Sequence, residues 1–205
     1  MEAEGVVEDL RPTVTLLNEV FGFEPPIGVA HLEGYYRGNP EGPAAVGRVD
    51  VDGRQVGNYA LIPLRFRAAD GRTIRLGLGV DLCVHPDARG SGTYRRTVED
   101  SYRAGIAGGL DGILGVANAQ SVPRMVETMG WSALESLPVR LLPARGGGER
   151  LTSVEVDGSL LASGLLDELL PEPTGAPSSG HATIWSADLL RWRLARPGAR
   201  YTLHV

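Results

Sequence analysis

The chain has 205 residues, of which 42% are hydrophobic, enough for one domain with a real core or for one domain with a small appendage. Its 20 basic residues are all arginine and its net charge is -5, which excludes a catalytic lysine and argues against a nucleic-acid partner. The single cysteine, the acidic first residues and the lack of any apolar run near ~20 residues predict a cytoplasmic protein without internal disulfide, signal peptide or membrane span.

The first half of the chain predicts two helices and then an antiparallel meander. Apolar residues at helical spacing predict a helix over residues 10–21 and a second one over 27–36. The pairs Asp52-Gly53 and Asp70-Gly71 predict tight hairpin turns. The first turn joins predicted strands at residues 44–51 and 55–64, and the second joins predicted strands at 64–68 and 73–84.

The second half begins with a strand–helix–strand pattern. A helix is predicted over residues 93–107, a short buried strand over 113–117 and a helix over 121–129 that ends at Gly130. A crossover of this kind predicts parallel pairing of the strand at 113–117. Weaker patterns follow, for a strand at 139–142, a Gly-rich loop at 144–150, a helix at 160–170, a linker at 171–180, a helix at 187–194 and a strand at 201–205. We therefore divide the chain into a core, 1–143, and an extension, 144–205, and leave open whether the extension completes the sheet.

The segment at residues 82–94, Leu-Cys-Val-His-Pro-Asp-Ala-Arg-Gly-Ser-Gly-Thr-Tyr, has the layout of a pyrophosphate cradle. Gly90 and Gly92 allow the backbone to approach an anion, and the helix that follows directs its free N–H groups and positive dipole end toward it. A Rossmann fingerprint is excluded because Arg95 stands in place of its third glycine and Asp111 opens the next strand. A P-loop is excluded because the chain has no lysine.

The same segment resembles the acyl-CoA motif of the GNAT acyltransferases, Arg/Gln-x-x-Gly-x-Gly/Ala. Arg89 and Gly92 match that motif, and Tyr94 stands where a small residue is usual. The stretch from Asn118 to Trp131 resembles a second motif of the family. The resemblance covers about residues 44–131. It implies a mixed α+β fold in which a β-meander precedes a strand–helix–strand unit, with a V-shaped splay between strands that holds CoA.

The resemblance also implies a co-substrate and its contacts. Acetyl-CoA would place its pyrophosphate on the loop amides and its pantetheine arm against the strand ending at Val84, whose backbone N–H would donate to the thioester carbonyl. No metal is implied. The residues expected to bind CoA are Leu82, Cys83, Val84, Arg89, Gly90, Ser91, Gly92, Thr93, Tyr94 and Asn118.

Asp81 is the candidate general base, because a carboxylate on this strand often takes the amine proton in the family, usually through water. The alternative is a charged residue on the solvated face of the strand. Met125 stands where many members have a tyrosine that protonates the leaving thiolate, and methionine cannot donate a proton. The donor is then Tyr94, Tyr102 or water, or the step needs no acid, or the protein does not catalyse.

Tyr35 and Tyr36 lie in a region that borders the acceptor pocket in this family, so we expect them to contact the substrate by stacking, with core packing as the alternative. A segment from Ile184 to Arg193 resembles a Trp-Arg segment of larger GNAT-like proteins.

The sequence thus predicts an N-acyltransferase that moves an acetyl group from acetyl-CoA to a small-molecule amine by direct attack, without a covalent enzyme intermediate. Two alternatives remain: a non-catalytic GNAT-fold protein that binds CoA or a small molecule, and a biosynthetic enzyme that reuses the fold for another reaction. No nucleic acid or membrane is expected as a partner, a homodimer is left open, and the sequence does not identify the acceptor.

Overall fold

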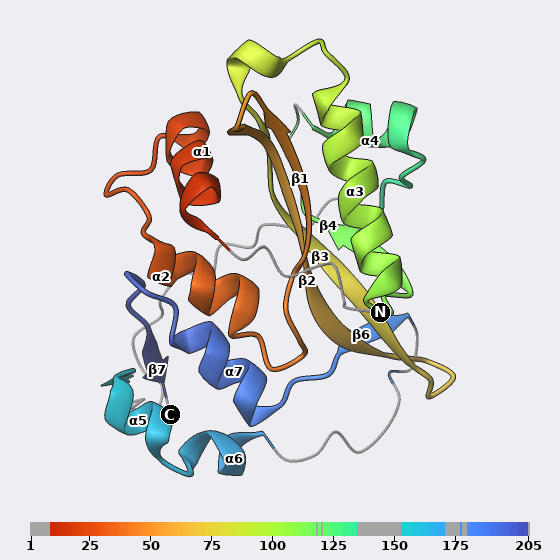
Figure 1. Ribbon diagram of the computed structural model, residues 1–205. Helices are drawn as coiled ribbons and strands as arrows, with labels where there is room; N and C mark the ends of the chain where they lie inside the picture. The colour runs from red at the N-terminus through yellow and green to blue at the C-terminus, as the bar shows by residue number, and fades with distance from the viewer. Residues whose placement is uncertain are drawn as a thin grey trace.

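The computed structural model describes residues 9–117, 119, 121–134, 153–170, 177 and 180–204. It consists of a mixed β-sheet with helices on both faces (Figure 1). Helix α1 (Arg11–Phe21) and the short helix α2 (Val29–Leu32) cover one face, and α3 (Thr93–Ala107) covers the other. The predicted helices at 10–21 and 93–107 are confirmed.

The sheet has the strand order β1-β2-β3-β4, with β6 beside β2. The β1–β2, β2–β3 and β2–β6 pairs are antiparallel, and β3 and β4 are parallel. The predicted meander and the predicted parallel crossover are therefore confirmed. The strands are β1 (Ala45–Val51), β2 (Arg54–Ala68), β3 (Thr73–Val84), β4 (Gly112–Gly115) and β6 (His181–Thr183).

Strand β2 is one long strand, so the prediction of separate strands at 55–64 and 64–68 is wrong. Pro63 has no N–H to donate, yet the strand continues through it because β1 pairs no farther than Leu61. The carbonyl oxygen of Pro63 instead accepts from Asn39 Nδ2 at 2.7 Å. Beyond it, β6 takes up the same edge opposite Phe66 to Ala68.

Residues of β2 alternate between the two cores of the molecule, as the two-residue period of a strand requires. Ala60 and Ile62 pack with α1 and α2, whereas Tyr59 and Leu61 pack with Val98 of α3. All five are at most 1% exposed, so both faces of the strand are covered at residues 59–62.

Glycines on β1 and β2 bring α3 close to the sheet. A Cβ atom at Gly47 would lie 2.0 Å from the carbonyl oxygen of Thr97, and one at Gly57 would lie 2.2 Å from the Thr97 hydroxyl oxygen. Only glycine permits this approach, and the approach fixes where the N-terminus of α3 lies relative to β3.

The predicted helix at 27–36 consists of two parts. Helix α2 continues into a π-helical turn, η1 (Glu33–Arg37), closed by a hydrogen bond of 3.0 Å from Gly38 N to Glu33 O. Turns of this kind are common at functional sites. In this turn, Tyr36 packs into the core beneath the sheet. The neighbouring Tyr35 packs against Trp192 in the C-terminal part of the chain.

After β4, the helix predicted at 121–129 is confirmed as α4 (Val122–Met129), which ends at Gly130 in a left-handed conformation. The predicted helix at 160–170 is wrong as a single element. Ser163 is extended, so two short helices form, α5 (Gly158–Ala162) and α6 (Leu165–Leu169). Within the described parts of the chain, no helix combines the length and apolar character that a membrane crossing needs.

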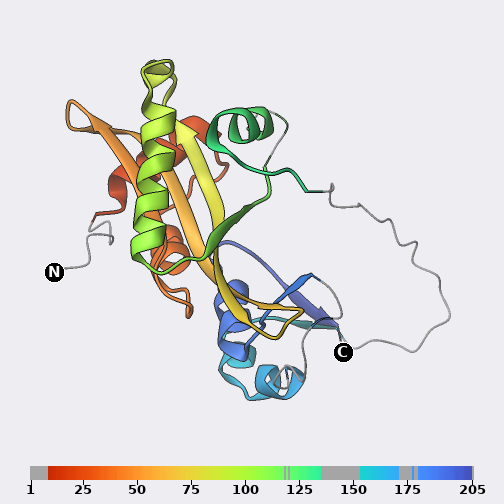
Figure 2. The same ribbon diagram turned by 90° about the vertical axis from the view of Figure 1, so that its right-hand side faces the viewer.

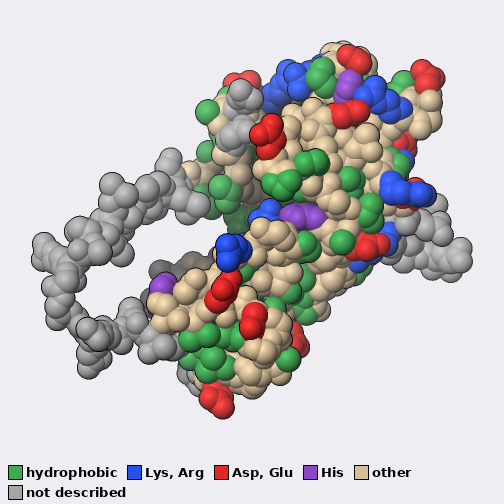
Figure 3. Space-filling view, turned by 90° about the vertical axis from the view of Figure 1, so that its left-hand side faces the viewer, with side chains coloured by type: hydrophobic (Ala, Val, Ile, Leu, Met, Phe, Trp, Pro, Cys, Tyr) green, Lys and Arg blue, Asp and Glu red, His purple; other side chains and the backbone are tan. Residues whose placement is uncertain are grey.

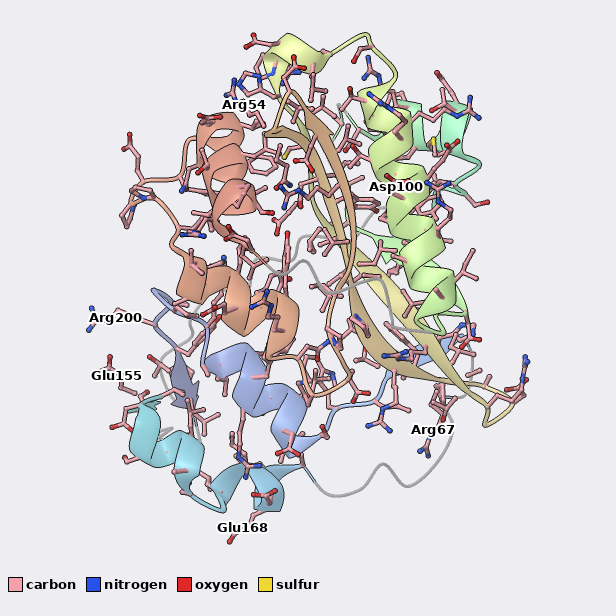
Figure 4. The ribbon with its side chains drawn as sticks, in the orientation of Figure 1. Arg54, Arg67, Asp100, Glu155, Glu168 and Arg200 are labelled. Carbon is pink, nitrogen blue, oxygen red and sulfur yellow. The ribbon has the colours of Figure 1, made fainter. Side chains whose placement is uncertain are left out.

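Helix α7 (Ala187–Leu194) confirms the predicted helix at 187–194, and β7 (Thr202–His204) confirms the predicted strand at 201–205. Strand β5 (Ser153–Glu155) pairs with β7, and Arg200 forms an ion pair of 3.4 Å with Glu155 at this edge (Figure 4). The strand predicted at 139–142, the loop at 144–150, most of the linker at 171–180 and the division near residue 143 lie outside the described residues.

Candidate functional site

The parallel strands β3 and β4 separate toward one end of the sheet. They pair from Leu76–Gly112 to Gly79–Gly115, and β3 then runs on to Val84 with no described strand on that side. Figure 2 shows β4, in green, turning away from the yellow β3 toward α4. The V-shaped splay expected from the sequence is therefore present.

The loop at the open end of the splay has the geometry of an anion cradle. Gly90 and Gly92 have φ angles of 82° and 78°, so their left-handed conformations need glycine, while open space surrounds both α-carbons. Gly92 is the N-cap of α3, and no side chain in the described structure caps that helix. The first N–H groups of α3 are free to bind an anion.

Side chains around the cradle give it a positive charge and hold the conformation of its loop. The first turn of α3 contains no acidic residue and includes Arg95 and Arg96. The hydroxyl oxygens of Ser91 and Thr93 lie 2.8 Å apart, and Ser91 donates to the carbonyl of Ala88. Thr93 is 1% exposed, so it anchors the loop, and its side chain is not available to a ligand.

The backbone of Val84 faces the open side of β3. The next residue, His85, donates its N–H to Val56 on β2, and backbone groups alternate in direction along a strand. Consistent with that alternation, Val84 O accepts from Arg89 Nε at 3.4 Å on the side of the loop. The Val84 N–H therefore points into the splay, as an oxyanion donor there would have to do.

Asp81 lies in an irregular part of β3. Its φ angle is 54°, one of two positive values found for non-glycine residues in the described chain, and the register with β2 shifts between Asn58 and Ala60. Strained backbone at such a bulge redirects a side chain. The Asp81 carboxylate accepts a hydrogen bond of 2.8 Å from the Tyr36 hydroxyl. The Asp81 side chain is thus half-buried and hydrogen-bonded to a buried tyrosine.

A buried polar network fixes this carboxylate. Asn58 Nδ2 donates to the Tyr36 hydroxyl at 3.2 Å and to the carbonyl oxygen of Asp81 at 3.0 Å. Gln55 connects Asn58 to Thr13 of α1. Burial raises the pKa of Asp81, while the Tyr36 hydrogen bond and the charges of His31 and Arg196 lower it in part. A carboxyl group with a raised pKa takes up a proton more readily than an ordinary aspartate does.

Three tyrosines and Met125 form the core between the sheet, α3 and α4. Met125 is 5% exposed and packs with Tyr59, so it fills space at the position where the resemblance led us to expect a tyrosine hydroxyl. Tyr102 accepts a hydrogen bond from the indole of Trp131. The hydroxyls of Tyr59 and Tyr94 are buried without a partner among the described residues. No described residue uses either hydroxyl, and neither oxygen is exposed at the surface.

The remaining sequence-predicted residues differ in their exposure. Leu82 packs in the core on the α3 side, whereas Cys83 is buried on the α1 side, where burial raises its thiol pKa to about 12. A thiol in that state is not a nucleophile.

Tyr36 is 2% exposed, so its ring offers no face for stacking on a ligand, and its hydroxyl instead orients the Asp81 carboxylate. Tyr35 is half-buried. Asn118 lies outside the described residues.

Two cavities flank the site. The larger, of 840 Å³, lies between the end of α3, β4 and α4 and is mostly apolar, with Gly115, Ala117 and Met125 in its wall. The smaller, of 360 Å³, lies between η1 and α7 and is lined by Tyr35 and Trp192 among others. Sequence reasoning did not assign Asn58 or Trp192 to the site, because their partners Asp81 and Gly34 are distant in sequence.

The fold is similar to several solved structures at low sequence identity. A protein of Agrobacterium tumefaciens str. C58 assigned as an acetyltransferase is 13% identical, with a TM-score of 0.53 over 69% of this chain and 100% of the other. A transcriptional regulator from Bacillus halodurans C-125 is 19% identical, with a TM-score of 0.50 over 67% and 97%. An acetyltransferase of Trypanosoma brucei is 23% identical, with a TM-score of 0.47 over 65% and 93%.

No protein-family model and no curated protein sequence matches the chain. The structural likeness, together with the meander, the parallel crossover and the splay, shows that the chain has a mixed α+β, GNAT-like fold. At these sequence identities the likeness defines the fold, and the activity has to be argued from the site itself.

Proposed function

We propose that the protein is an acyl-CoA-dependent N-acyltransferase that transfers an acetyl group from acetyl-CoA to a small-molecule amine. The observation that carries the proposal is the placement of three groups on one strand–loop–helix segment. An uncapped helix N-terminus, a strand N–H directed into a splay and a half-buried carboxylate lie within residues 81–93. Pyrophosphate binding, carbonyl polarisation and proton acceptance need these three groups.

The residues present fit CoA. A Cβ atom at Gly90 or Gly92 would meet nothing within 4 Å, so the backbone there is open to a ligand, and the free N–H groups of α3 match a pyrophosphate. Arg89 lies at the rim, where a guanidinium pairs well with phosphate oxygens. The splay between β3 and β4, into which the Val84 N–H points, supports placement of the pantetheine arm between these two strands.

Acetyl-CoA supplies the activated acyl group. In the transfer, the amine nitrogen forms a bond to the carbonyl carbon while the carbon–sulfur bond breaks. Val84 N–H donates to the carbonyl oxygen, on which negative charge develops. Asp81 accepts the proton that the amine loses, through water, and the departing thiolate takes up a proton from the Tyr94 hydroxyl or from solvent. Tyr36 and Asn58 hold Asp81 in place.

The test is release of free thiol from acetyl-CoA on addition of amines, followed with a thiol-reactive dye. The protein's one cysteine, Cys83, is buried, so the background signal is low. Amine-dependent thiol release that is lost in Asp81→Asn supports the proposal. Amine-dependent release that Asp81→Asn leaves unchanged would contradict the role of Asp81.

A second candidate function is a CoA-binding protein without transferase activity. It is favoured by Met125, which packs in a core where the related enzymes have a proton donor. This candidate predicts CoA binding without thiol release for every amine tried. The same assay, combined with calorimetry of CoA binding, distinguishes the two functions.

A further inference from the structure

The smaller cavity has a preformed aromatic wall. The Tyr35 and Trp192 rings stack with centroids 5.5 Å apart and an interplanar angle of 4°. Trp192 Nε1 donates to Gly34 O at 2.7 Å, a contact that joins α7 to η1. Since the rings are already fixed by each other and by this hydrogen bond, a ligand would not have to order them. The volume of 360 Å³ is within the ~300–1,000 Å³ usual for small-molecule sites.

The cavity is positively charged. His31, Arg191, Arg193 and Arg196 line it, and no acidic residue does. Arg191 is neutralised by Asp167 and Asp188. Arg193 lies over the Trp192 ring at 6.0 Å. Over the described parts of the chain, no carboxylate comes within ion-pair distance of Arg193 or Arg196. Figure 3 shows this side of the molecule, where a histidine and basic side chains border a hollow.

The cavity lies beside the proposed base. The ring of Tyr35 is 6.2 Å from the ring of Tyr36, which donates to Asp81. Two cavity residues, His31 and Arg196, act electrostatically on the Asp81 carboxyl, and Arg196 together with burial lowers the pKa of His31. A small molecule held in the cavity is therefore close to the group that would take its proton.

We propose that this cavity binds the acceptor, and that the acceptor is an amine that also carries an anionic group, a carboxylate or a phosphate. The proposal rests on the proposed function. Arg196 pairs with the anionic group, the His31 imidazole donates a hydrogen bond to it, and the Tyr35–Trp192 wall packs against the apolar part. A guanidinium without a carboxylate partner in a concave site favours an oxyanion strongly. A simple cationic amine would instead be repelled by this lining.

The test compares matched amines in the thiol-release assay. L-phenylalanine is compared with L-phenylalaninamide for the carboxylate, and O-phosphoethanolamine with ethanolamine for the phosphate. The anionic member of at least one pair is expected to have a kcat/KM at least about tenfold higher, the effect of ~1.4 kcal/mol of binding energy. The pair that responds identifies the anionic group. Equal or better turnover of both neutral partners would overturn the proposal.

A variant separates recognition from folding. Arg196→Gln is expected to raise KM for the anionic amine about tenfold and to change KM for the neutral amine much less, while Arg200→Gln, an exposed arginine paired with Glu155, has no effect. An unchanged KM in Arg196→Gln would contradict the proposal.

Binding is measured separately, so that failure of the acyltransferase proposal can be recognised. The same amines are titrated calorimetrically into the protein saturated with CoA. Binding of an anionic member that is lost in Arg196→Gln supports the cavity assignment even if no thiol is released. Absence of binding by both anionic amines at millimolar concentration overturns it, whatever CoA itself does.

Discussion

The Tyr36 hydroxyl donates to Oδ2 of Asp81 at 2.8 Å, and so joins η1 to the irregular part of β3 across 45 positions of sequence. The tyrosine is buried, and both burial and the neighbouring carboxylate raise its pKa well above the ordinary value. It therefore stays protonated and donates at any working pH. In the proposed mechanism this contact orients the base and sets its basicity.

Asp81→Asn is expected to reduce kcat by about 10²–10⁴-fold, the usual contribution of a general base. Asparagine keeps an acceptor for Tyr36 and tolerates the φ angle of 54°. Steady-state thiol release measures the loss. Asp87→Asn, a change at an exposed residue of the neighbouring loop, is the control and should retain full activity.

The same variant makes a prediction for stability. Burial raises the folded-state pKa of Asp81, so the stability that this group contributes is present below its ordinary pKa and is lost as pH rises through the raised value. Asp81→Asn should therefore have a Tm at pH 7.5 at or above that of the wild type, with the difference shrinking toward pH 3. A clearly lower Tm at pH 7.5 would show that the charged carboxylate stabilises the fold.

Tyr36→Phe should move the acid limb of the pH profile of kcat/KM to higher pH. The Tyr36 hydrogen bond favours the charged form of Asp81, so its removal raises the pKa of Asp81 further. A pH series from 5 to 9 measures the limb. A shift to lower pH, or a fall in kcat without any shift, would contradict this role.

Tyr94→Phe tests the proton donor for the thiolate. Its hydroxyl is buried without a described partner, so its removal should leave the Tm unchanged or higher, while kcat falls by about 10²-fold if it is the donor. Tyr59→Phe is the matched control. The Tyr59 hydroxyl is also unpartnered among the described residues, but its whole side chain is only 1% exposed and so cannot contact a substrate. Equal kcat in both variants would assign protonation to solvent.

Gly47→Ala should destabilise the protein by roughly 1–3 kcal/mol through overpacking, because the new Cβ would meet the Thr97 backbone. Displacement of α3 should also weaken CoA binding. Gly164→Ala is the control, since nothing lies within 4 Å of its added Cβ and its φ angle is not positive. Thermal unfolding and calorimetry give the two effects separately.

Local signals predicted the parts of the fold that depend on short stretches of chain. The Asp52-Gly53 turn has φ angles of 49° and 77°, as the residue pair predicted, and α3 extends over the predicted residues because glycines bound it on both sides. By contrast, the point at which β1 begins, opposite Leu61, decides whether a strand can run through Pro63. A pattern within β2 alone could not show where β1 begins relative to β2.

The cradle could be predicted because it is contiguous in sequence, whereas the rest of the site is assembled from distant segments. Asp81 was identified by position, but its burial depends on Tyr36 and Asn58. The acceptor cavity depends on the contact of Trp192 with Gly34, 158 positions apart. No periodicity or spacing connects such pairs, and only packing shows them.

The most direct test of the central claim is calorimetric titration of CoA into the wild-type protein, Gly92→Asn and Gly92→Asp. Asparagine and aspartate have the same shape and both tolerate the φ angle of 78° at this position, so the two variants differ only in charge. The account predicts micromolar binding for the wild type, similar or modestly weaker binding for Gly92→Asn, and loss of at least about tenfold more affinity for Gly92→Asp. Equal affinity for the two variants, or no binding of CoA to the wild type, would contradict a pyrophosphate site at the N-terminus of α3.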